Sequence, residues 1–83
     1  MDTHFNFIGI LVRDPELDTT HLQDTLTSYG CNIRTRLGLN STGNKKNPLI
    51  LLDLYGDEQE QNNLMSALKA IPGIEVKNMI FQG

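Results

Sequence analysis

The chain has 83 residues, a formal net charge of -3, 39% hydrophobic residues and 20% charged residues. Because domains usually have about 50 to 250 residues, we expect a single domain over residues 1–83, too apolar to be a disordered segment. The acidic charge disfavours direct binding of nucleic acid, which draws on clustered Lys and Arg, and no apolar stretch has the roughly 20 residues of a membrane span.

The N-terminal residues and the cysteine content indicate a cytoplasmic protein. Residues 1–6 carry no basic residue, so they lack the positive start of a secretory signal. Cys31 is the single cysteine, which excludes a disulfide within one copy and fits a reducing compartment. His4, His21 and Cys31 match no metal-site spacing, which leaves only a site shared between copies. We therefore expect no metal and no cofactor.

The first two predicted elements are a strand and a helix. Residues 5–12 are β-branched, aromatic or apolar on both alternating faces, which predicts a central strand. Asp14, Pro15 and Glu16 then predict a helix start, because they suit the N-cap, the first helical position and the positive helix end.

The predicted helix continues to Gly30. Leu22, Leu26 and Tyr29 lie on one stripe of it, and Gly30 is expected at the C′ position that ends it. Residues 31–39 predict a half-buried strand, because their odd positions are mostly apolar. These odd positions are Cys31, Ile33, Leu37 and Leu39.

The second half of the chain predicts a loop, a strand, a helix and a last strand. Turn-forming residues fill positions 40–48, and the nearly apolar residues 49–55 predict a strand buried on both faces. Asp57 and Glu60 resemble a capping box at the start of a helix that ends before Pro72 and Gly73. Loose alternation then predicts a strand over residues 74–81.

The order β-α-β-β-α-β predicts an α+β fold of the ferredoxin-like type, an antiparallel sheet with two helices on one face. The other sheet face stays open, and the first and third strands leave it apolar. We therefore expect this face to mediate assembly into a homo-oligomer, a dimer or a tetramer.

Four segments resemble, in order and spacing, the ACT-like regulators of iron-only hydrogenase systems, and the resemblance covers almost the whole chain. These segments are residues 8–14, 29–30, 36–39 and 68–77. The resemblance implies a ferredoxin-like fold, a homo-oligomer and a regulatory role.

Five residues are candidates for binding a small anionic ligand. Gly9 lies within a strand, where glycine either allows close packing or gives a ligand access. Arg13 and Asp14 lie at a strand-to-helix turn that can hold an anion, although Asp14 also suits a plain helix cap. Arg34 and Arg36, two positions apart, are expected to share a strand face and to clamp a carboxylate, or else to protect a sheet edge.

The sequence favours a regulatory module over an enzyme. No nucleophile with a base, phosphate-binding glycine loop or metal motif is present, so no catalytic residue is expected. One alternative is an adaptor subunit that docks on a larger protein partner without a small ligand. A less favoured alternative is an acylphosphatase-like hydrolase, in which Arg13 would hold the phosphate.

Overall fold

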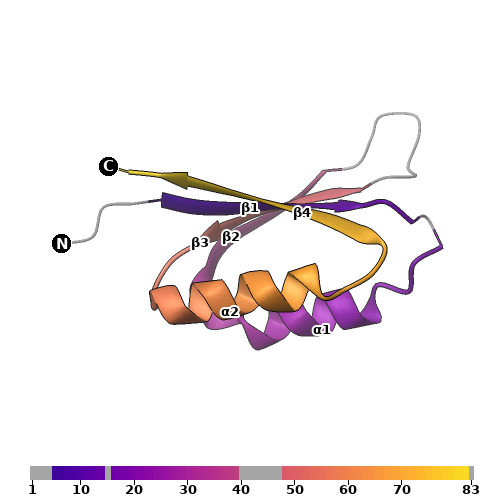
Figure 1. Ribbon diagram of the computed structural model, residues 1–83, viewed down its shortest axis with the longest axis horizontal. Coiled ribbons are helices and arrows are strands. Elements are labelled where there is room, and N and C mark those ends of the chain that lie inside the picture. The colour runs from indigo at the N-terminus through magenta and orange to yellow at the C-terminus, as the bar shows by residue number, and fades with distance from the viewer. Residues whose placement is uncertain (1–4, 15, 40–47, 83) are drawn as a thin grey trace.

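The computed structural model describes residues 5–14, 16–39 and 48–82 and confirms the predicted fold. The elements are β1 (Phe5–Val12), α1 (Thr20–Ser28), the 3-10 turn η1 (Gly30–Asn32), β2 (Ile33–Leu39), β3 (Leu49–Leu54), α2 (Glu58–Lys69) and β4 (Ile74–Phe81). The strands lie in the order β2-β3-β1-β4, and all neighbours are antiparallel. Both helices lie on the same side of this sheet (Figure 1). Neither described helix is long and apolar enough to cross a membrane.

The core lies between the sheet and the two helices. Alternate residues of the central strand β1 point into it, and Ile8 and Ile10 are 1% and 0% exposed. The predicted stripe of α1 is confirmed, since Leu22 and Leu26 are buried and Tyr29 packs against the core from its edge. The buried apolar residues are Ile8, Ile10, Val12, Leu22, Leu26, Leu52, Leu54, Leu64, Leu68 and Ile71.

A chain of amide side chains links the sheet to α2 inside this layer. Asn6 Nδ2 donates to Gln61 Oε1 at 2.8 Å, and Gln61 Nε2 donates to the carbonyl of Gly56 at 3.0 Å. Asn78 Nδ2 donates to Asn6 Oδ1. Asn6 and Gln61 are buried, and a buried amide without partners costs about 1–3 kcal/mol, so the bonds between them stabilise the packing of α2 on the sheet.

Helix α1 begins at Thr20, so the prediction that it begins at Asp14 is wrong. The Oδ1 atom of Asp14 accepts a hydrogen bond from the backbone N–H of Glu16 at 2.9 Å and closes a turn instead. The residue that bonds to the helix start is Asp18, whose Oδ1 accepts a hydrogen bond from the backbone N–H of Thr20 at 3.0 Å. Pro15 lies outside the described residues.

The end of β1 is tied to the start of β4, and α1 begins only after this connection. The backbone N–H groups of Arg13 and Asp14 both donate to the carbonyl of Gly73, at 2.9 and 3.1 Å. These bonds extend the sheet past Val12, and only after them does the chain turn towards the helix layer.

The other predicted element ends agree closely with the structure. Helix α1 ends before Gly30, but Gly30 opens the turn η1 and does not take a left-handed conformation. Asp57 caps α2, accepting from the backbone N–H of Gln59 at 3.0 Å. Strand β4 covers the predicted residues. Of the predicted loop, residues 40–47 lie outside the described ranges.

A bulge in β2 changes the predicted face of its residues. Ile33 pairs with Leu54 and Thr35 with Asp53, so Arg34 is an extra residue between these pairs. Ile33 therefore shares the helix side with Leu54. The odd residues after the bulge lie on the opposite side, so the prediction that the odd positions form one half-buried face is wrong.

We call the side of the sheet away from the helices the open face. Its strand residues are Phe5, Phe7, Gly9 and Leu11 of β1, Thr35, Leu37 and Leu39 of β2, Leu49, Leu51 and Asp53 of β3, and Glu75, Lys77, Met79 and Phe81 of β4. Six large apolar residues of this face have exposed fractions of 40% to 55%: Phe5, Leu37, Leu39, Leu51, Met79 and Phe81. The expectation that this face is apolar is therefore confirmed.

We predict that Gly73→Ala destabilises the protein. Gly73 has φ of 85°, a conformation that costs other residues about 1–2 kcal/mol. An added Cβ would also lie 3.3 Å from both Asp14 Cβ and Leu17 Cδ1. We therefore expect urea unfolding to show a loss of about 1–2 kcal/mol.

The matched control is Gly30→Ala, because a Cβ there meets no atom within 4 Å and φ is not positive. Its free energy of unfolding should be unchanged or slightly higher, since alanine restricts the unfolded chain. Equal stability of the two variants would contradict our account of the Gly73 turn.

Candidate functional site

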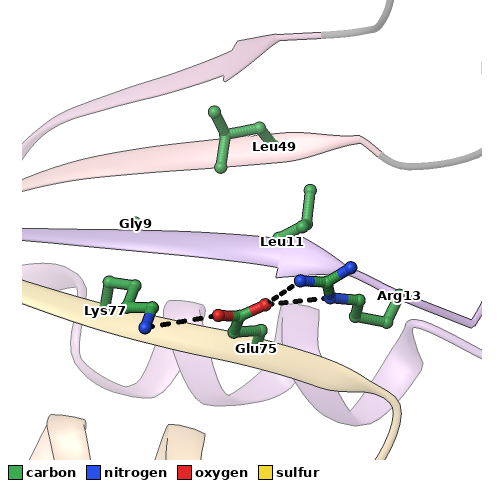
Figure 2. Close-up of a pocket in the computed structure, with 6 residues that line it drawn as sticks. All are labelled: Gly9, Leu11, Arg13, Leu49, Glu75 and Lys77. Carbon is green, nitrogen blue, oxygen red and sulfur yellow. Dashed lines mark hydrogen bonds and ion pairs between the residues drawn. The ribbon is translucent and has the colours of Figure 1, made fainter.

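A hollow of about 330 Å³ opens in the open face, over the three neighbouring strands β3, β1 and β4 (Figure 2). It is lined by Gly9, Leu11, Arg13, Leu49, Glu75 and Lys77. The antiparallel register brings these residues together, because Gly9 pairs with Lys77 and Leu11 pairs with both Glu75 and Leu49. Two of the five predicted site residues, Gly9 and Arg13, thus line one hollow.

The polar side of the hollow is a carboxylate between two cations (Figure 2). Arg13 Nε donates to Glu75 Oε1 at 2.8 Å, and Arg13 Nη2 contacts the same oxygen. Lys77 Nζ lies 3.4 Å from Glu75 Oε2. The hydrogen bond from Arg13, its positive charge and Lys77 lower the pKa of Glu75, which stays ionised. Two cations and one carboxylate leave one net positive charge.

The floor of the hollow is open because residue 9 is glycine. A Cβ at Gly9 would lie 3.6 Å from Leu51 Cδ2, which is an ordinary van der Waals contact. Its φ is not positive, so the backbone would also accept another residue. Close packing within one copy therefore does not explain Gly9, and a larger side chain here would fill the hollow.

Asp14 does not line this hollow. Its carboxylate holds the turn after β1 by accepting from the backbone N–H of Glu16, and its backbone N–H bonds to Gly73. Asp14 therefore stabilises the turn that follows Arg13.

The two arginines of β2 do not share a face, so the prediction of an arginine clamp is wrong in its geometry. The bulge at Arg34 separates them, and Arg36 pairs with Leu52 on the helix side. Arg36 Nη2 donates to Gln23 Oε1 of α1. The guanidinium of Arg34 lies over the ring of Tyr55, 5.0 Å from its centroid. Each arginine thus has a separate partner within the chain.

Sequence reasoning missed the other four residues of the hollow, Leu11, Leu49, Glu75 and Lys77. The spacing of Glu75 and Lys77, two apart in a predicted strand, did place them on one strand face. Nothing in the sequence showed that this face lies beside Gly9, because the register of β4 on β1 is a long-range property.

The other candidate sites are less suited to binding a ligand or a metal ion. A smaller hollow of about 190 Å³ is lined by Asn6, Glu58, Asn62, Ile80 and Gln82, and the amide of Asn6 is already bonded within the fold. Cys31 is exposed. Within residues 5–14, 16–39 and 48–82, no group of three or more His, Cys, Asp and Glu could hold a metal ion, and His4 lies outside these ranges.

We predict that the pKa of Glu75 lies below that of an ordinary glutamate and rises in Arg13→Gln. A lowered pKa in the folded state stabilises the fold above the unfolded-state pKa, and this contribution is lost as the pH falls through the lowered value. The titration of the Glu75 side-chain carboxyl carbon, followed by NMR, measures the shift.

The control for this titration is Arg34→Gln, which also removes one guanidinium but leaves the contacts of Glu75 intact. Glu75 should titrate as in the parent protein. An unchanged midpoint in Arg13→Gln would show that Arg13 does not hold this carboxylate in solution.

No protein-family model and no curated protein match this chain. Among solved structures, the uncharacterized protein TM1266 from Thermotoga maritima superposes with a TM-score of 0.80 at 23% identity, covering 96% of this chain and 100% of its own. SnoaB, a cofactor-independent oxygenase from Streptomyces nogalater, has a TM-score of 0.59 at 10% identity and covers 100% of this chain and 94% of its own.

A formyltetrahydrofolate deformylase from Pseudomonas putida KT2440 has a TM-score of 0.53 at 10% identity, and the match covers 93% of this chain but only 28% of the deformylase. At such identities the similarity concerns the fold alone. The chain is therefore similar to these proteins in its ferredoxin-like fold.

Proposed function

We propose that this chain is a regulatory ACT-like module without catalytic activity, which self-associates through the open face and binds a small anion in its hollow. The observation that carries this proposal is the large apolar area of the open face. Soluble monomers rarely expose contiguous apolar patches of more than a few hundred Å², and larger patches usually mark interaction sites.

The size of the open face supports pairing with a second copy. The four strands are six to eight residues long, so at spacings of about 4.8 Å between strands and about 3.3 Å per residue they cover roughly 450 Å². Two such faces would bury roughly 900 Å² in total, which is near the lower limit for a specific interface. Six exposed apolar residues on this face supply the hydrophobic contribution.

A regulatory role fits the chemistry of the hollow better than an enzymatic role does. Its polar groups are a carboxylate and two cations that already bind one another, and no cysteine, serine or histidine lines it. Such a set can recognise charge but offers no nucleophile with an adjacent base. The resemblance to ACT-like regulators of iron-only hydrogenase systems points the same way.

We predict that Leu51→Glu weakens self-association. Leu51 lies on β3 within the open face and is 40% exposed, so a glutamate there leaves the core intact. Burying its carboxylate between two sheets costs at least a few kcal/mol, so we expect the dissociation constant to rise at least about tenfold. Light scattering over a dilution series measures this, and circular dichroism checks that the variant is folded.

The matched control is Ile80→Glu, the same kind of change at an apolar residue that is 53% exposed but lies on the helix side of β4. Its self-association should equal that of the parent protein. A parent protein that stays monomeric at all concentrations would contradict the proposal and favour an adaptor whose open face docks on a different protein.

A further inference from the structure

We infer that the hollow binds a small aliphatic monocarboxylate and that a second copy of the chain closes the site. The carboxylate lies against Arg13 and Lys77, and the aliphatic part lies on Leu11 and Leu49. This inference rests on the proposed self-association and deepens it, because it makes the ligand part of the interface between copies.

The charges of the hollow select a monoanion. Glu75 neutralises one of the two cations, so one positive charge remains for a ligand. Arg13 uses its Nε and Nη2 groups on Glu75, whereas a guanidinium carries five N–H donors and an ammonium carries three. The side chains of Arg13 and Lys77 are 63% and 80% exposed, so their remaining donors are accessible.

The shape of the hollow selects a small ligand with an apolar part. Its volume of about 330 Å³ lies at the lower end of the range of ligand pockets, about 300 to 1,000 Å³. Leu11 and Leu49 form a continuous apolar surface beside the cations, since they face each other across β1 and β3. Gly9 leaves room for the ligand between this surface and Lys77.

One copy of the chain leaves this site incomplete. Bound ligands usually lose about 70–90% of their surface to the protein, but this hollow is a shallow depression in a sheet face. A second open face laid on the first would cover it, and the large exposed side chains of that face are mainly apolar. Excluding water in this way also strengthens the attraction between a carboxylate and the two cations.

Ligand and assembly are therefore linked. Without a ligand, the lining of the hollow in each copy carries one net positive charge, and within the hollow this charge loses water without gaining a partner when a second copy covers it. A bound monocarboxylate neutralises it and so favours association. Linkage then requires that association favours ligand binding by the same factor, typically about 5- to 150-fold.

The test measures the dissociation constant of self-association by sedimentation equilibrium, with and without isobutyrate at constant ionic strength. We expect saturating isobutyrate to tighten association at least about fivefold. Isobutylamine, which has the same branched carbon skeleton but an ammonium group in place of the carboxylate, should have no effect. Inorganic phosphate should have little effect, and an effect as large as that of isobutyrate would overturn the assignment of a carboxylate with an apolar part.

Two variants test the site itself. Lys77→Gln removes the excess charge, so it should associate more tightly than the parent without ligand and lose the response to isobutyrate. Lys69→Gln makes the same change at the end of α2, away from the open face, and should behave as the parent. Gly9→Val fills the hollow on a strand where valine is favourable, so it should self-associate and not respond to isobutyrate.

These outcomes separate the inference from the proposed function. Association of the parent protein that isobutyrate leaves unchanged would overturn the ligand assignment and leave self-association standing. A monomer in all conditions would overturn both. A response to isobutyrate that persists in Gly9→Val and Lys77→Gln would place the ligand elsewhere and overturn the assignment to this hollow.

Discussion

The structure depends on one constraint: two helices cover only one face of a four-stranded sheet. Strand β1 is apolar on both sides, so one row of its side chains enters the core and the other row faces away from the helices. Burying apolar area is the main favourable contribution to folding. The second row of β1 side chains stays outside the core, so its apolar area contributes little to the folding of a single copy. The same area is available for association with another copy, which is why the open face dominates the proposed function.

The central position of β1 also explains where the hollow lies. Because β1 pairs with β3 on one side and β4 on the other, Gly9 and Leu11 have neighbours from both strands. The apolar Leu49 comes from β3, and the charged Glu75 and Lys77 come from β4. The hollow is therefore apolar on one side and polar on the other, as recognition of a carboxylate with an aliphatic part requires.

The fold alone does not decide the function. A similar fold occurs in an oxygenase and in one part of a deformylase, at 10% identity to this chain in each case. Assembly is therefore inferred from the exposed apolar side chains of the open face, and the anionic ligand from Arg13, Lys77 and the room that Gly9 leaves. Neither packing nor backbone conformation within one copy requires a glycine at position 9.

The sequence by itself determined the element order, the fold and the apolar nature of the open face. These follow from local patterns, as at Asp57 before α2 and in the two apolar faces of β1, because caps and alternation act within a few residues. Of the candidate site, it found Gly9 and Arg13. It failed where distant segments meet, because the bulge at Arg34 and the bonds to Gly73 depend on pairing partners far away in the chain.

The tertiary structure alone decided which side chains surround Gly9. The register of β4 on β1 places Glu75 and Lys77 beside it, and a shift of one residue would turn both to the helix side. The structure also separated Arg34 from Arg36, since one extra residue reverses the alternation of β2. Local sequence thus specifies the strands, whereas long-range register specifies the site, because only pairing across the sheet brings these charges together.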